Sequence, residues 1–297
     1  MTAADPSPRK AAAWMAGWLT AMVVMAVAGR AATQTLHVFQ IMEIRSLLGF
    51  VLLWPLIRAS GGVRALGTSR LGQQVARNTV HYAAQFGWFF ALTLIPIAQV
   101  VAIEFTMPIW TALLAVSFLG ERLGASRVVA VVLGVVGVAV IVRPGVDHVE
   151  PGQLIALAAA VGFAISVILV KSLTRTDSAV AIVFWMLVVQ SAIGAIPALV
   201  VWRTPTAAVW PWLLVIALCG TYSHFCMTQA LRHAEATMIV PMDFLRVPLS
   251  AAAAWLVYGE RIDAFTIGGA AMILLANLLN LRRPVPAPKG RQMATHP

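Results

Sequence analysis

Long apolar stretches alternate along the chain with short segments that carry most of its charge. The apolar stretches have the length of a membrane-crossing helix, about 20 residues. Runs such as Val128–Val142 do not alternate apolar and polar residues, which excludes a membrane β-barrel and predicts an all-α integral membrane protein. Ten transmembrane helices are expected, at roughly 14–33, 38–58, 78–95, 98–119, 126–143, 152–171, 179–202, 210–230, 236–258 and 264–281.

One stretch of the pattern occurs twice, once in each half of the chain. Ala91–Arg122 and Ala230–Arg261 are identical at nine of 32 paired positions, including the Gly-Glu-Arg that closes each copy. An acidic residue also recurs inside each apolar run, as Glu104 and Asp243. A bias towards Ala, Val and Leu does not produce these polar matches, so we interpret the pattern as an internal duplication.

The duplication predicts that its two copies cross the membrane in opposite directions. The offset between the copies carries the fourth span onto the ninth, five spans later, and an odd number of crossings inverts the direction. Two five-helix inverted-topology repeats around a central cavity are therefore expected, a construction typical of secondary transporters. The first repeat is assigned to residues 1–145 and the second to 146–283, followed by a disordered cytoplasmic tail at 284–297.

The composition favours the same class of protein. Of 297 residues, 60% are hydrophobic and 11% charged, whereas soluble domains carry about 25% charged residues. A net charge of +10 would suggest nucleic-acid binding in a soluble protein, but here the basic residues lie between the apolar runs. Fifteen Lys and Arg fall in segments expected inside and four in those expected outside. Both termini are therefore placed on the cytoplasmic side of a bacterial-type inner membrane, with no nucleic-acid partner.

Features near the ends of the spans fit the same arrangement. Trp18 is one of several tryptophans expected in the interfacial belts. The glycine-rich, basic segment Arg58–Arg77 is expected to be a solvated cytoplasmic loop. Arg9 and Lys10 before the first span would also fit a signal peptide, but a five-helix repeat requires this span as a helix.

With its doubled run ending in Gly-Glu-Arg, the chain resembles the drug/metabolite transporter superfamily in its ten-helix, EamA-type branch. The resemblance implies two five-helix halves around a cavity lined largely by helices 3, 4, 8 and 9. It also implies transport of a small solute, since such proteins move amino acids, cationic drugs or nucleotide sugars. The sequence departs in detail: Pro108 and Pro248 are out of register by one residue, and Pro241 pairs with no proline.

Four ionisable residues are predicted well inside the spans: Arg45, Glu104, Asp243 and Arg246. Each costs at least about 2.5–3.5 kcal/mol at the centre of a membrane helix, so each requires a partner or a water-filled cavity. Asp243 and Arg246 share one helix face and form either an internal ion pair or a site for the amine and carboxylate of a zwitterion. Glu104 is expected to pair with Arg45 at similar depth, or else to contact solute or carry a proton.

Polar and aromatic residues on neighbouring spans complete the candidate substrate site. His81, Gln85 and Trp88 form one stripe at helical spacing, and the offset between the two copies pairs Gln85 with His224. Each histidine either lines the cavity or bonds a nearby backbone carbonyl, and Trp110 either stacks on a substrate or packs in the bundle. The predicted substrate-binding residues are Arg45, His81, Tyr82, Gln85, Glu104, Trp110, Tyr222, His224, Asp243 and Arg246.

Two further motifs are assigned structural roles. The Gly-Glu-Arg segments at 120–122 and 259–261 are expected to be turns that end helices, where the arginine suits the helix C-terminus. Glycines in the fifth and tenth spans (Gly134, Gly137, Gly268 and Gly269) allow close helix packing, within the chain or across a homodimer through these two helices.

The sequence contains no catalytic motif, phosphate loop or Cys/His cluster with metal-binding spacing. We therefore expect no enzyme activity, no cofactor and no metal. The leading hypothesis is an inner-membrane secondary transporter that exports small metabolites, amino acids foremost, by alternating access. The alternatives are efflux of lipophilic cations or drugs, and a membrane enzyme or scaffold without transport.

Overall fold

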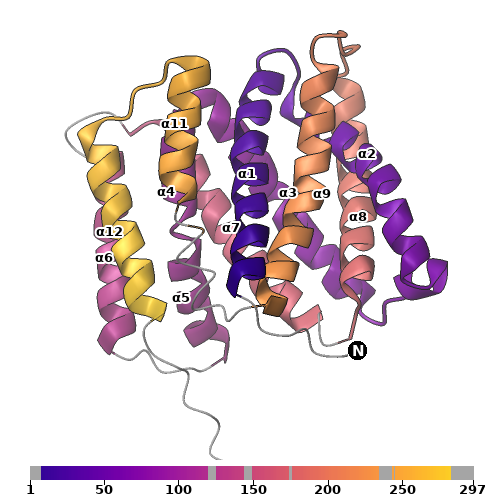
Figure 1. Ribbon diagram of the computed structural model, residues 1–297, viewed down its shortest axis with the longest axis horizontal. Coiled ribbons are helices and arrows are strands. Elements are labelled where there is room, and N and C mark those ends of the chain that lie inside the picture. The colour runs from indigo at the N-terminus through magenta and orange to yellow at the C-terminus, as the bar shows by residue number, and fades with distance from the viewer. Residues whose placement is uncertain are drawn as a thin grey trace, which may run out of the picture.

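A computed structural model of the protein describes residues 8–119, 125–143, 149–173, 176–233, 243 and 245–281. Within these ranges every regular element is a helix, and the helices stand side by side with upright axes (Figure 1). The elements are α1 (Pro8–Thr33), α2 (Val38–Ala59), the short 3₁₀ helix η1 (Gly62–Leu66), α3 (Leu71–Leu94), α4 (Ile97–Glu104), α5 (Met107–Leu119), α6 (Ala125–Val142), α7 (Pro151–Leu173), α8 (Ala179–Val200), α9 (Trp210–His233), α11 (Arg246–Tyr258) and α12 (Ala264–Leu281).

Two helices begin earlier than the apolar pattern predicted. α1 begins at Pro8 rather than 14, and α3 begins at Leu71 rather than 78. The backbone stays helical through polar residues, many of which have good helix propensity, so the apolar window marks only part of each helix. As a result Trp18 lies well inside α1 rather than near its start. Arg77 belongs to α3, and its side chain is buried rather than solvated in a loop.

The fourth predicted span, 98–119, is two helices instead of one. α4 ends at Glu104 and α5 begins at Met107, with Phe105 and Thr106 between them. Pro108 has no N–H with which to bond the carbonyl of Glu104 four residues earlier, so a continuous helix would lack this bond. In the ninth predicted span, 236–258, α11 begins only at Arg246. Each of these two predicted spans therefore contains the start of a helix, α5 in the fourth span and α11 in the ninth.

Each long helix packs against a partner from the other half of the chain. α1 pairs with α9, α2 with α8, α3 with α7, α4 with α11, and α6 with α12. Gln40 at the start of α2 exchanges two hydrogen bonds with the backbone of Arg203, in the segment between α8 and α9: its Nε2 donates to the Arg203 carbonyl and its Oε1 accepts from the Arg203 N–H. The two halves therefore form one interdigitated bundle instead of two separate domains.

Three helices of the second half repeat the bounds of three in the first. α9, α11 and α12 start and end at one constant offset from α3, α5 and α6 respectively. This is the same offset that carries Ala91 onto Ala230 in the doubled sequence stretch. The duplication seen in the sequence is therefore also present in the first and last residues of these helices.

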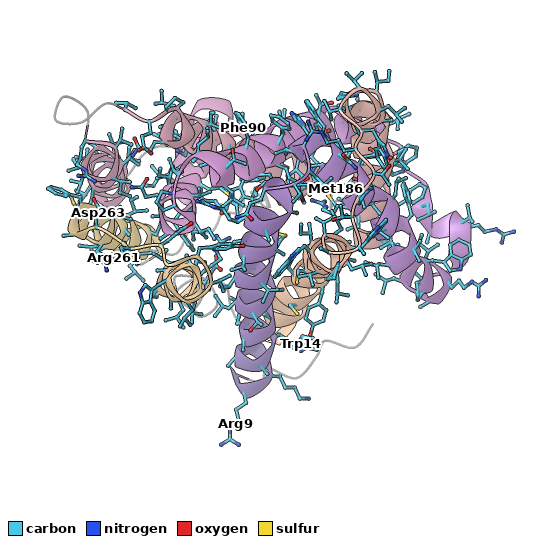
Figure 2. The ribbon with its side chains drawn as sticks, turned by 90° about the horizontal axis from the view of Figure 1, so that it is seen from above. Arg9, Trp14, Phe90, Met186, Arg261 and Asp263 are labelled. Atoms are coloured by element: carbon cyan, nitrogen blue, oxygen red, sulfur yellow. The ribbon has the colours of Figure 1, made fainter. Side chains whose placement is uncertain are left out.

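The outward faces of the bundle are apolar. Val51, Ile196, Val200 and Leu256 are each more than two thirds exposed, and side chains project outward around the bundle (Figure 2). In the described part of the chain, α1, α2, α7 and α8 each contain an apolar stretch long enough to cross a membrane. Such a surface is suited to lipid.

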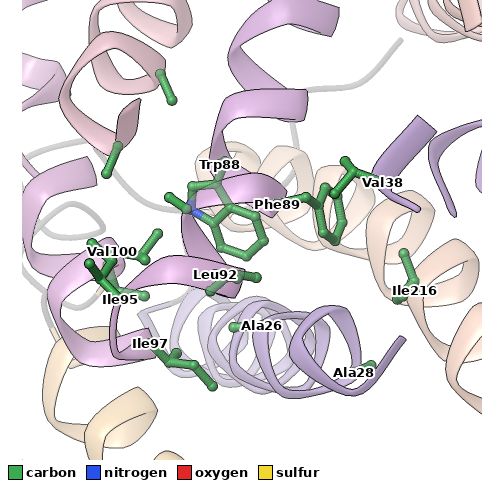
Figure 3. Close-up of a cluster of buried hydrophobic side chains, with 14 of the residues drawn as sticks. Ala26, Ala28, Val38, Trp88, Phe89, Leu92, Ile95, Ile97, Val100 and Ile216 are labelled. Carbon is green, nitrogen blue, oxygen red and sulfur yellow. The ribbon is translucent and has the colours of Figure 1, made fainter. Parts of the chain in front are cut away.

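The apolar core lies where α1, α3 and α4 meet. Phe89 and Leu92 of α3 pack near Ile97 of α4 and small residues of α1 (Figure 3). Lipid tails are as apolar as these side chains, so close packing rather than exclusion of water stabilises such contacts in a membrane. The core fixes the positions of α3 and α4, which carry part of the site described next.

Candidate functional site

A buried ion pair lies at the break between α4 and α5. Arg246, the first residue of α11, donates from Nη1 and Nη2 to Oε1 of Glu104, the last residue of α4, at 3.0 Å each. The two side chains are only 6% and 12% exposed. The prediction that Glu104 pairs with Arg45 was wrong. α2, which carries Arg45, packs against α8 and α9, and Arg45 lies beside Gly220 of α9.

Three more side chains complete this site, which we call the Glu104–Arg246 cluster. Asp243 Oδ1 lies 3.7 Å from Arg246 Nε, so the ion pair expected within this span is present. Trp18 Nε1 of α1 donates to Asp243 Oδ1 at 2.6 Å, and Trp88 Nε1 of α3 donates to Glu104 Oε2 at 2.8 Å. The cluster therefore joins α1, α3, α4 and α11.

The cluster contains two carboxylates and one guanidinium. With all three groups ionised, its net charge is −1, which favours a cationic ligand group or a proton at this place. The guanidinium carbon of Arg246 also lies 4.7 Å from the centre of the Phe105 ring, a cation–π contact. Both Nη atoms of Arg246 donate to Glu104, while its Nε is buried without a hydrogen bond in the described part of the chain.

The other predicted site residues do not gather around this cluster. His81 faces α7, where its Nδ1 lies 3.3 Å from Ser166 Oγ and its ring lies 5.4 Å from that of Phe163. Trp110 Nε1 donates within its own segment to Thr106 Oγ1. Tyr222 is 44% exposed.

Two predicted site residues of α3, Tyr82 and Gln85, keep buried oxygens without a hydrogen bond in the described part of the chain. The Tyr82 hydroxyl lies near Oε2 of Glu43, since both atoms would be within 3 Å of a Cβ at Gly194. The other Glu43 oxygen accepts a hydrogen bond from Ser191. The side chain of His224 lies outside the described residues.

The tryptophans of the cluster were not among the predicted site residues. Trp88 shared the stripe with His81 and Gln85, so its helical spacing was a usable signal. Trp18 was expected near the start of the first span, because the start of α1 was predicted too late. Nothing in the sequence pairs either indole with its carboxylate, since the residues come from different helices.

A groove of about 850 Å³ lies elsewhere, between α11 and α12. Its lining is mostly apolar and includes Val247, Trp255 and Ile267, with Glu260 and Arg261 at one end. Neither Glu104 nor Arg246 lines it. The groove is therefore separate from the charged site.

The second Gly-Glu-Arg motif ends a helix and ties four elements together. Gly259 has a φ of 67°, the left-handed conformation that ends α11. Glu260 Oε2 accepts from the backbone N–H of Ile97, the first residue of α4, at 2.9 Å, and its Oε1 lies 3.1 Å from Arg30 Nη2 of α1. Arg30 also donates to the carbonyl of Ile95. The expected turn is confirmed for this copy; Gly120, Glu121 and Arg122 lie outside the described residues.

Asp263 strengthens the same end of the bundle. Its Oδ1 accepts from the backbone N–H of Thr266 at the start of α12, and its Oδ2 pairs with Arg143 at the end of α6. Burial raises the pKa of Asp263, but the bonds from Thr266 and the charge of Arg143 outweigh burial, so the pKa lies below its ordinary value. This contribution to stability is present above the ordinary pKa and is lost as the pH falls through the lowered one.

Replacing Glu260 by Gln should lower the free energy of unfolding by about 1.5–3 kcal/mol, the range for hydrogen bonds to charged groups. The change removes the charge that pairs with Arg30 and weakens the acceptor at the start of α4. Thermal unfolding of the purified protein measures the loss. Arg261→Gln, at an exposed neighbouring position, is the control. Equal unfolding temperatures for the two variants would contradict this role of Glu260.

Comparison with known proteins shows where this chain belongs. The model of the EamA-like transporter family matches residues 9–143 and again residues 150–282. A solved crystal structure has the same fold, with a TM-score of 0.66 and 17% identity, covering 92% of this chain and 97% of that chain.

Relatives with known solutes are similar along most of their length. An S-adenosylmethionine uptake transporter of Rickettsia prowazekii is 28% identical over 243 residues, 82% of each chain. A riboflavin transporter of Brucella anthropi is 31% identical over 80% of this chain and 85% of its own. The pseudopaline exporter CntI of Pseudomonas aeruginosa is 26% identical over 85% of this chain and 89% of its own. The chain belongs to the EamA-like transporter family and is a multi-pass membrane transporter, not an enzyme.

Proposed function

We propose that this transporter moves small metabolites, amino acids foremost, by alternating access around the Glu104–Arg246 cluster. The observation that carries the proposal is the buried ion pair between two helix ends, Glu104 closing α4 and Arg246 opening α11. In secondary transporters, discontinuous helices near the middle of the membrane build the substrate and coupling-ion sites. Ionisable groups at such depth mark pathways for solutes or protons.

The helix bounds support the proposal that the chain consists of two inverted repeats, residues 1–145 and 146–283, with five transmembrane helices each. α3 ends and α9 begins at the same end of the bundle, so these two helices, which correspond to one another in the duplication, run in opposite directions. Equivalent positions in the two halves exchange their environments when one half rocks against the other. The cluster joins both halves and is placed to respond to this motion.

The orientation follows from the charge of the connecting segments. Positive residues favour the cytoplasmic side, which supports the proposal that both termini, and the tail at 284–297, lie on the cytoplasmic side of a bacterial inner membrane. We propose export as the direction. Relatives are named for uptake as well as export, so the family is compatible with either direction.

The charge of the cluster supports a substrate with a cationic group. Two carboxylates face one guanidinium, and the indoles of Trp18 and Trp88 lie against the carboxylates. An ammonium group, as found on every free amino acid, would neutralise the excess negative charge. S-adenosylmethionine, the solute of one relative, is an amino-acid derivative.

Transport by purified protein in proteoliposomes tests the proposal. The panel contains labelled amino acids, S-adenosylmethionine and riboflavin, and flux is compared with empty vesicles. We expect at least one amino acid or amino-acid derivative to move, Glu104→Gln to abolish this flux, and Glu150→Gln, an exposed control, to preserve it. If no panel member moves faster than in empty vesicles, the substrate class is wrong.

Efflux of lipophilic cations is the second candidate. The net negative cluster and its two tryptophans also suit an aromatic cation. Drug-resistance profiles of cells that express the protein separate the two candidates. Resistance to lipophilic cations together with no flux of any amino acid would favour this alternative.

A homodimer through α6 and α12 stays a prediction. Gly137 and Gly269 already face one another within the chain, so they are not available to a second copy. The outer faces of these helices expose Val132, Val135 and Ile267. Any dimer would therefore use these side chains and not the close-packed glycines.

A further inference from the structure

Two arginines inside the bundle have no acidic partner in the described part of the chain. Arg45 of α2 is 6% exposed and Arg77 of α3 is 5% exposed. Arg30, Arg143 and Arg246 each pair with a carboxylate. Arg45 and Arg77 form no such pair among the described residues. A buried charge of this kind requires compensation from somewhere, and a ligand is one source.

α2 and α3 pack against one another, and Glu43 of α2 and Tyr82 of α3 meet at Gly194, where Glu43 Oε2 and the Tyr82 hydroxyl would both lie within 3 Å of a Cβ. The two helices run in opposite directions, so Arg45, two residues after Glu43, and Arg77, five residues before Tyr82, lie on the same side of this contact, where their positive charges repel one another. Arg45 extends beside Gly220 of α9, where a Cβ would lie 3.7 Å from its Nε, so the glycine leaves room for the side chain. Folding thus places two like charges together in an apolar bundle. An anion between them would turn this repulsion into attraction.

Nearby hydrogen-bonding groups include unused donors. Arg77 Nη1 donates to Asn78 Oδ1, which leaves Arg77 Nε and Asn78 Nδ2 buried and without an acceptor in the described residues. Arg45 likewise donates no hydrogen bond within the described residues. An oxyanion has several acceptor lone pairs and matches guanidinium groups in geometry as well as charge.

Two acidic side chains near these arginines form hydrogen bonds to other residues. Oε1 of Glu43, two residues before Arg45, accepts from Ser191 of α8, and its Oε2 lies near the Tyr82 hydroxyl. Gln74, one turn before Arg77, donates to Asp177, which also accepts from Thr68. Neither carboxylate is paired with Arg45 or Arg77. Among the described residues no carboxylate therefore neutralises either arginine by a direct ion pair.

We propose that Arg45 and Arg77 bind the oxyanion group, a carboxylate or a phosphate, of the solute that this protein transports. The inference rests on the proposed transport function and makes it more specific. Arg246 is bonded to Glu104, whereas Arg45 and Arg77 have no carboxylate partner among the described residues, so the oxyanion is assigned to Arg45 and Arg77.

Thermal unfolding of the purified full-length protein tests the site without transport. Potassium phosphate and potassium acetate are compared with potassium chloride at equal ionic strength and pH 7. We expect either oxyanion to raise Tm by several degrees over chloride in the unmodified protein, because a ligand that binds only the folded state stabilises it. Arg45→Gln and Arg77→Gln should each abolish this rise.

Arg58→Gln, at an exposed position of the same helix as Arg45, is the matched control and should keep the rise. If a glutamine variant does not fold, Arg45→Lys and Arg77→Lys are used instead. Lysine keeps the positive charge but lacks the planar guanidinium, so we expect the lysine variants to need at least a threefold higher oxyanion concentration for the same rise in Tm. The proposal is overturned if the unmodified protein shows no rise, or if the rise persists in both arginine variants.

Flux measurements separate this inference from the function on which it rests. If the rise depends on Arg45 and Arg77 but no solute crosses the vesicle membrane, the oxyanion site stands and the transport proposal fails. If an amino acid is transported and Arg45→Gln and Arg77→Gln leave its KM unchanged, transport stands and the assignment of the oxyanion site fails.

Discussion

Replacing Arg246 by Gln is expected to reduce transport to the level of empty vesicles and to lower the free energy of unfolding by about 3–5 kcal/mol. The change leaves Glu104 and Asp243 as two buried carboxylates without their shared cation. Removing one partner of a buried ion pair costs more than the pair contributes, because the remaining charge is uncompensated. Flux in proteoliposomes and Tm of the purified protein measure the two effects.

The double variant Glu104→Gln with Arg246→Gln is the control for this prediction. It removes one carboxylate together with the guanidinium, so its loss of stability should be clearly smaller than the sum of the two single losses. Transport should stay absent, because the charges around which the solute binds are gone. Additive stability losses, or normal flux in either single variant, would contradict the assigned role of the pair.

Replacing Gly269 by Ala is expected to lower the free energy of unfolding by about 1–3 kcal/mol, the range for overpacking a close contact. A Cβ at this position would lie 2.5 Å from the backbone oxygen of Gly137 and 2.5 Å from Cγ1 of Ile141. A backbone oxygen in a helix cannot rotate away, so α6 and α12 must separate. Tm of the purified protein reports the change.

Gly268 provides a control in the neighbouring position of the same helix. A Cβ there would meet no atom within 4 Å. Gly268→Ala should leave Tm unchanged or raise it slightly, because Ala favours a helix by up to about 1 kcal/mol over Gly. A loss in Gly268→Ala equal to that in Gly269→Ala would show that the contact with Gly137 is not the cause.

The pattern of apolar stretches predicted most helices to within a few residues. α2, α6, α7 and α12 follow the expected spans closely, because a helix in lipid must be apolar over a fixed length. The duplicated stretch also contains the two carboxylates, Glu104 and Asp243, that the structure brings together at Arg246. Those features are local in sequence or repeat at a constant offset.

The residues that pair with those carboxylates could not all be predicted from the sequence. Glu104 was paired with Arg45 on the basis of depth, whereas the structure pairs it with Arg246. Depth along a helix does not say which helices are neighbours, and α2 packs against α8 and α9 rather than α4. The burial of Arg77 was missed for a related reason, because a charged residue at the edge of an apolar window looks like part of a loop.

Counterflow in proteoliposomes tests most directly the claim that this protein is an alternating-access carrier. Vesicles are loaded with unlabelled solute from the transported panel, then diluted into a trace of the labelled solute. A carrier that exposes its site to one side at a time should accumulate label transiently above its equilibrium level, and Glu104→Gln should abolish this overshoot. Label that only rises to equilibrium without an overshoot in the unmodified protein would contradict alternating access.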